Sequence, residues 1–88
     1  MRRLITHKSF DKQFGKLPKE IQQKFLDRSN VFLHDVANPL LNDHALTGKW
    51  AGHRSINVTG DFRALYRLIA EDEYLFAAIG THSELYGS

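Results

Sequence analysis

The chain has 88 residues, of which 42% are hydrophobic and 25% charged, with no cysteine and a formal net charge of +2. A chain of this length is expected to fold as one domain, 1–88, around one modest core. Its composition excludes disulfides and thiolate metal sites, and no apolar run reaches the ~20 residues of a membrane span, so a cytoplasmic protein without membrane contact is expected.

The first part of the sequence predicts a short strand followed by two helices. Residues 2–6 form a brief apolar run that is typical of a strand. Ser9 is the expected N-cap of a first helix, whose apolar positions are Phe10, Phe14 and Leu17. A second helix is expected to start at Pro18 and to end before Asn38-Pro39. Its apolar stripe consists of Ile21, Phe25, Phe32 and Val36.

The second part of the sequence predicts an antiparallel meander. Turn signals fill 40–52, and three strand-like runs follow, separated by short polar turns, at 54–58, 62–70 and 74–79. The order β-α-α-β-β-β indicates an α+β fold, in which a helical hairpin packs on one face of a small, mainly antiparallel sheet. The other face is expected to be partly open, with a short terminal element after the last strand.

Alternation in the first meander strand predicts which side chains reach that open face. Ile56 and Val58 are expected to point toward the helices, and Ser55 and Asn57 away from them. Arg54 shares the parity of Ile56. It is therefore either part of a basic substrate-binding face or one half of a structural ion pair.

The charge distribution over 44–70 favours binding of a phosphodiester. The basic residues of this segment, opposed by Asp61 alone, are Lys49, Arg54, Arg63 and Arg67. His44 precedes the first meander strand and His82 follows the last, so an antiparallel sheet can bring both imidazoles together. Two imidazoles beside a carboxylate can transfer protons near neutral pH. A metal site made of His44, Asp61 and His82 is an alternative that no local ligand spacing supports.

The other aromatic and histidine side chains have simpler expected roles. His7, His34 and His53 are expected at the surface, and Trp50 in the core rather than as a stacking platform.

Three stretches resemble the RelE/ParE toxin superfamily and, within it, the YafQ-type mRNA interferases: HALTGKWAGHR at 44–54, NVTGDF at 57–62 and GTHSELYG at 80–87. The resemblance implies a toxin of a type II toxin–antitoxin system that cleaves mRNA in the ribosomal A site without a metal or other cofactor. It also implies a cognate antitoxin, mRNA and the 70S ribosome as partners, and either a monomeric toxin or a toxin–antitoxin hetero-oligomer.

Carried over by position, the resemblance implies catalytic roles for His44, Asp61 and His82, and it matches Tyr86 to an aromatic residue near the active site. Where the YafQ pattern has a histidine on the first meander strand, this chain has Asn57, which cannot exchange a proton. Arg63 falls where RelE-type members have a phosphate-contacting arginine.

The resemblance leaves the division of roles open. His82 is expected to be the general acid, His44 or Asp61 the base, and Arg63 with Arg54 the stabilising cations, although the two histidines could exchange roles. Lys49, Asn57 and Arg67 complete the expected substrate-binding set. A ParE-like inhibitor of DNA gyrase and a non-catalytic binding module are the alternatives, and Asn57 keeps the first of them open.

Overall fold

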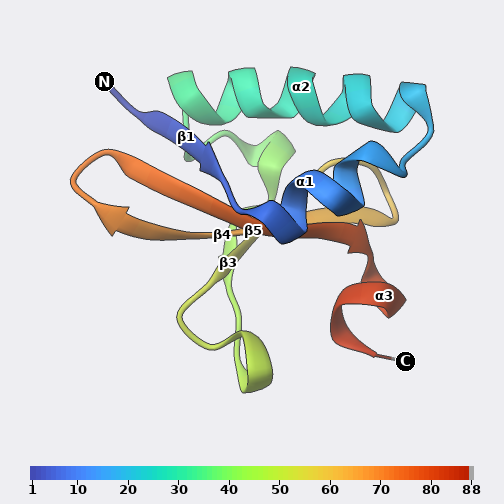
Figure 1. Ribbon diagram of the computed structural model, residues 1–88. Helices are drawn as coiled ribbons and strands as arrows, with labels where there is room; N and C mark the ends of the chain where they lie inside the picture. The colour runs from blue at the N-terminus through green and yellow to red at the C-terminus, as the bar shows by residue number, and fades with distance from the viewer. Residues whose placement is uncertain (88) are drawn as a thin grey trace.

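The computed structural model describes residues 1–87, which form three α-helices, two short 3₁₀ helices and a five-stranded sheet (Figure 1). In chain order the elements are β1 (Arg3–Thr6), α1 (Lys8–Gly15), α2 (Lys19–His34), η1 (Pro39–Leu41), β2 (His44–Ala45), η2 (Gly48–Trp50), β3 (Arg54–Asn57), β4 (Phe62–Ala70), β5 (Glu73–Thr81) and α3 (His82–Tyr86). The predicted α+β class is confirmed. The structure adds β2, which lies inside the segment predicted as a loop.

The sheet has the strand order β1-β5-β4-β3-β2. The pairs β2–β3, β3–β4 and β4–β5 are antiparallel, and β1 pairs with β5 in parallel. In Figure 1, α1 and α2 lie above the sheet, whereas α3 and the loop between β2 and β3 extend below it. The meander therefore forms the centre of the molecule, and each edge is a short strand.

Aromatic side chains fill the space between the helices and the sheet. Phe25 and Phe32 are seven residues apart on α2, so they lie on the same stripe of the helix. Phe32 has no exposed surface, and its ring centroid lies 4.8 Å from that of Tyr66, 5.0 Å from that of Tyr74 and 5.4 Å from that of Phe76. These edge-on contacts join α2 to both long strands.

The helix boundaries differ from the prediction at two points. The N-cap of α1 is His7 rather than Ser9: His7 Nδ1 accepts a hydrogen bond from the Ser9 backbone N–H at 3.1 Å. The Ser9 hydroxyl instead donates to the Ala77 carbonyl on β5 at 2.8 Å. Helix α2 ends at His34, so Val36 packs against the core from beyond the helix. Within residues 1–87, no helix is both long and apolar enough to cross a membrane.

The sheet face opposite α1 and α2 is less open than predicted. Alternation holds for Ile56 and Val58, which are buried in the helix-side core. On the other face, Leu65 and Ala78 form a second small core with Leu85 of α3. Trp50 and Tyr86 are half-buried and pack against this core, so Trp50 lies at its margin rather than inside a core as expected.

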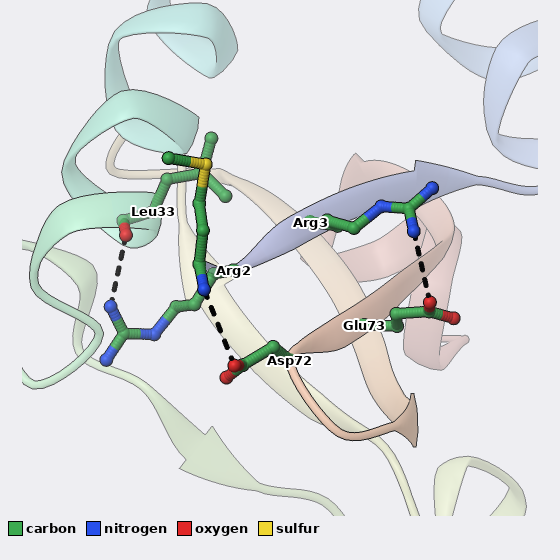
Figure 2. Close-up of polar contacts among 6 residues, drawn as sticks. Arg2, Arg3, Leu33, Asp72 and Glu73 are labelled. Carbon is green, nitrogen blue, oxygen red and sulfur yellow. Dashed lines mark hydrogen bonds and ion pairs between the residues drawn. The ribbon is translucent and has the colours of Figure 1, made fainter.

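The first strand is fixed by polar contacts at one end of the sheet, shown in Figure 2. The Arg2 guanidinium donates to the Leu33 carbonyl at 3.0 Å, and Arg3 pairs with Glu73 at 3.3 Å. The terminal amino group of Met1 lies 3.6 Å from the Asp72 carboxylate. Both ion pairs are exposed to solvent, so each contributes little to stability.

Candidate active site

A hollow of about 410 Å³ lies on the sheet face opposite α1 and α2. Its lining residues come from the segment around β2, from the start of β4 and from α3: Asn42, His44, Leu46, Thr47, Arg63, His82 and Tyr86. Four residues predicted from the sequence to act in catalysis or substrate binding therefore meet here: His44, Arg63, His82 and Tyr86.

Strand register brings His44 and Arg63 to this face. His44 is paired with Ser55 of β3, and Ser55 with Leu65 of β4. Side chains directly opposite each other in antiparallel strands share a face, and so do alternate residues of one strand. His44 and Arg63 consequently lie on the same face as Leu65, away from the helical hairpin.

Helix α3 places two further side chains at the hollow. His82 is its first residue and Tyr86 its last, so they lie one turn apart on one side of the helix. Their ring centroids are 4.6 Å apart, and the rings meet edge to face at 65°. The Tyr86 ring therefore restricts where the His82 imidazole can point.

The short helix α3 is held by contacts at both ends. At its start, Thr81 and Glu84 form a capping box, with bonds of 3.2 Å and 2.8 Å between each side chain and the other residue's backbone N–H. At its end, the Trp50 indole N–H donates to the Leu85 carbonyl at 2.8 Å. These contacts hold α3 against the sheet, and they thereby fix the positions from which His82 and Tyr86 reach the hollow.

Because Thr81 provides the cap of α3, Thr81→Ala is expected to lower the free energy of unfolding by ~1 kcal/mol. Chemical denaturation followed by circular dichroism measures this change. Thr47→Ala is the matched control, since Thr47 sits at the N-cap of η2 but its side chain makes no capping hydrogen bond. Equal losses in the two variants would contradict the assigned role of the capping box.

One nitrogen of the His44 ring is fixed by a hydrogen bond. His44 Nδ1 lies 2.8 Å from the Asn42 carbonyl oxygen. A carbonyl can only accept a hydrogen bond, so Nδ1 carries the proton and donates it. In the neutral ring, Nε2 is then left with a lone pair that can accept a proton.

Arg63 supplies a fixed positive charge. One of its terminal nitrogens, Nη1, donates to the carbonyls of Thr59 and Gly60 at 3.0 Å each, and to that of Phe62 at 3.2 Å. These acceptors all belong to the turn before β4 or its first residue. The guanidinium is therefore held in one place, and it is well suited to a phosphate.

Two other predicted site residues adjoin the hollow without lining it. The backbone carbonyl of Asp61 accepts a hydrogen bond from the backbone N–H of His82 at 3.2 Å. The Asp61 side chain is exposed. Asn57 is paired with Arg63 across β3 and β4, and its buried side-chain oxygen has no hydrogen-bond partner among residues 1–87. Both residues thus border the site, next to His82 and Arg63 respectively.

The structure does not bring Lys49, Arg54 and Arg67 into the hollow. The Lys49 ammonium lies 5.9 Å from the centre of the Trp50 ring. Arg54 and Arg67 line a different hollow, of about 840 Å³, beside the end of α2. The alternative of a structural ion pair is confirmed for Arg54, whose Nε lies 2.6 Å from the Asp43 carboxylate.

Asp43 is the centre of a network that sequence reasoning missed. Its carboxylate accepts hydrogen bonds from Arg54 and from the Tyr66 hydroxyl. Burial, followed by the bond to Asp43, raises the pKa of Tyr66 well above its ordinary value. The hydrogen bond to Asp43 likewise raises the pKa of Arg54. Tyr66 therefore stays a neutral donor, and Arg54 stays a cation.

The remaining histidines do not join the site. His34 is exposed on α2, as expected, whereas His53 is half-buried, with its ring 5.3 Å from that of Trp50. Among residues 1–87, no three histidine or carboxylate side chains are arranged to hold a metal ion, so the alternative of a metal site at His44, Asp61 and His82 has no support.

Sequence comparison identifies the family. Residues 2–87 match the family model described as the bacterial toxin of the type II toxin–antitoxin system, YafQ. The chain belongs to the YafQ toxin family. A curated relative, the putative toxin YafQ of Haemophilus influenzae, is 36% identical over 45 residues, which make up 48% of this chain and 44% of that protein. That match thus spans less than half of the relative's length.

Solved structures share the fold of this chain. The crystal structure of YafQ from Escherichia coli is 22% identical, with a TM-score of 0.81 and coverage of 99% of this chain and 100% of that one. The Escherichia coli DinJ–YafQ complex contains a chain with a TM-score of 0.80 at 23% identity, with the same coverage. At these identities the matches establish the fold. A conserved hypothetical protein from Helicobacter pylori is 32% identical, with a TM-score of 0.68 over 98% of this chain and 100% of that one.

Proposed function

We propose that this YafQ-family toxin is a ribosome-dependent endoribonuclease that cleaves mRNA in the ribosomal A site. The observation that carries the proposal is the meeting of His44, Arg63 and His82, from three separate elements, at one hollow. A proton acceptor, a proton donor and a fixed cation are the groups that cleavage of an RNA phosphodiester requires.

In the proposed reaction, each of these groups has one role. The 2′-oxygen of the RNA attacks the adjacent phosphorus while His44 Nε2 takes the 2′-OH proton. The bond from phosphorus to the 5′-oxygen breaks, and His82 gives a proton to that oxygen. The products are a 2′,3′-cyclic phosphate and a 5′-hydroxyl, so atoms and charge balance without a metal ion or other cofactor.

The remaining residues assist this step. Arg63 stabilises the negative charge that develops on the phosphoryl oxygens, since its guanidinium is already oriented. Tyr86 limits rotation of His82 through the contact between their rings. The Asn57 amide, beside Arg63, can bind substrate but cannot exchange a proton. His44 is preferred over Asp61 as the base because it lines the hollow.

The partners follow from the same proposal. The substrate is mRNA held by the ribosome, which requires a cytoplasmic protein. A protein antitoxin is expected to neutralise the toxin, because chains of this fold have been solved with partners named as antitoxins, as in the Escherichia coli DinJ–YafQ toxin-antitoxin complex. The toxin is expected to be active as a monomer and to be held inactive in a hetero-oligomer.

Arg63→Lys is expected to lower the rate of RNA cleavage by at least ~10-fold, because lysine keeps the charge but loses the planar fork that binds both the turn carbonyls and a phosphate. Single-turnover cleavage on programmed ribosomes measures the change. Arg67→Lys, on the same strand but outside the hollow, is the matched control and is expected to be nearly neutral. A larger loss in Arg67→Lys would move the phosphate site away from Arg63.

Controlled expression in bacteria separates this function from the alternatives. Wild type is expected to arrest translation before any change in plasmid supercoiling, and a His44→Ala/His82→Ala double variant is expected to permit growth. Loss of supercoiling before loss of translation would favour a gyrase inhibitor. Growth arrest that survives in the double variant without RNA cleavage would favour a non-catalytic binding module.

A further inference from the structure

The strand that carries His44 has little backbone support of its own. β2 consists of His44 and Ala45, forms only two residue pairs, both with β3, and lies at the edge of the sheet. Short edge strands open more readily than central ones. Something other than the β2 ladder must therefore hold the His44 ring in a constant direction.

The side chain of Asp43, immediately before β2, provides such a restraint. It reaches the face of the sheet that carries α1 and α2, opposite to the face of His44. There its carboxylate, whose side chain is only 11% exposed, accepts from Arg54 Nε at 2.6 Å and from the Tyr66 hydroxyl. Arg54 and Tyr66 are themselves paired across β3 and β4. Asp43 is thus tied to two strands of the central meander.

The anchor for these bonds is rigid. Tyr66 is only 3% exposed, and its ring contacts Phe32 and Phe76 in the main core. Its hydroxyl is the one polar atom at the end of that packed ring, and it donates to Asp43. Displacing Asp43 therefore costs a partly buried hydrogen bond to a side chain that is itself fixed in the core.

The link from Asp43 to the imidazole is direct. Asn42, on the other side of Asp43, has a left-handed backbone conformation with φ of 45°, and its carbonyl accepts the proton of His44 Nδ1 at 2.8 Å. Both the Cα of His44 and the carbonyl that fixes its tautomer are thus joined to Asp43 by one peptide unit each. A fixed Asp43 therefore restrains both the residue that donates this hydrogen bond, His44, and the one that accepts it, Asn42.

We propose that Asp43, bound by Arg54 and Tyr66 on one face of the sheet, is the positioning residue that fixes the tautomer and direction of His44 on the other. The effect on His44 stands by itself, whereas its consequence for RNA cleavage rests on the proposed function. Arg54 then acts through Asp43 and His44 rather than on the substrate.

Nitrogen-15 NMR of the histidine rings in the full-length protein tests the first part. Wild-type His44 is expected as the single Nδ1-protonated tautomer at high pH. Asp43→Ala is expected to convert it to a mixture, and Tyr66→Phe, which keeps the packed ring, to do so to a smaller extent. Glu73→Gln, which removes the exposed pair with Arg3, is the matched control and is expected to leave His44 unchanged.

Single-turnover cleavage on programmed ribosomes tests the second part. Asp43→Ala is expected to lower the cleavage rate ~10- to 100-fold while the half-saturating ribosome concentration stays unchanged, because the base is misplaced rather than lost. Unchanged His44 spectra in folded Asp43→Ala and Tyr66→Phe would overturn the proposal. If wild type cleaves no RNA but the tautomer shifts as expected, the positioning role stands and the proposed function fails.

Discussion

Replacing His82 by alanine is expected to lower the single-turnover rate of mRNA cleavage by ~10²- to 10⁴-fold, which is the range for loss of a general acid or base. His82 is the first residue of α3, and its side chain is exposed at the hollow. The fold should survive the change, because Leu85 and Trp50 anchor α3 without using the imidazole. The measurement is the cleavage rate at saturating ribosomes, beside a thermal melt.

The pH dependence of the same rate separates the two histidines. A general acid acts only in its protonated form and a general base only in its unprotonated form, so the wild-type rate is expected to fall at both high and low pH. His82→Ala should lose the high-pH limb and His44→Ala the low-pH limb. His34→Ala, which removes an exposed histidine of α2, should keep both limbs. If each site variant loses the limb assigned to the other residue, the roles of acid and base are exchanged.

Replacing Phe32 by alanine is expected to lower the free energy of unfolding by ~3–5 kcal/mol, the usual cost of removing a fully buried aromatic ring. Phe32 has no exposed surface and touches three aromatic rings from β4 and β5. Small domains have only ~5–15 kcal/mol of total stability, so this variant is expected to be partly unfolded at physiological temperature. Urea denaturation followed by circular dichroism measures the loss.

Leu26→Ala provides the matched comparison for Phe32→Ala, since Leu26 lies on the same helix but is 52% exposed. It is expected to change stability by no more than ~0.5 kcal/mol. A loss in Phe32→Ala close to that of Leu26→Ala would mean that the core between α2 and the sheet is not packed as described.

The fold could be predicted from the sequence because its main elements are strongly periodic. The spacing of Phe25 and Phe32 predicts one buried face of a helix, and alternation around Ile56 predicts which face of β3 meets it. β2 could not be predicted in this way. It is only two residues long, and turn-forming residues surround it. Its pairing depends on β3, which supplies the partner strand.

The candidate site was partly predictable for a related reason. His44, His82 and Tyr86 stand in motifs that resemble a known family, so their sequence context identified them. Asp43 carries no such signal, because its role depends on Arg54 and Tyr66, which are 11 and 23 residues away in the sequence.

Of the predicted substrate-binding cations, Arg63 lines the hollow and Arg54 does not, and the reason is again one that the sequence does not show. Charge counts predicted a basic face, but strand parity sends Arg54 to the opposite side of the sheet from Arg63. Composition records how many cations a segment has, whereas register decides where each one points.

Primer extension on a reporter mRNA in a bacterial translation extract is the most direct test of whether the protein cleaves mRNA on the ribosome and uses His82 to do so. New 5′ ends at codon-phased positions are predicted for wild type, only while ribosomes translate, and they are predicted to form ~10²- to 10⁴-fold more slowly with His82→Ala. Absence of new ends with a folded wild-type protein, or equal cleavage by His82→Ala, would contradict the account.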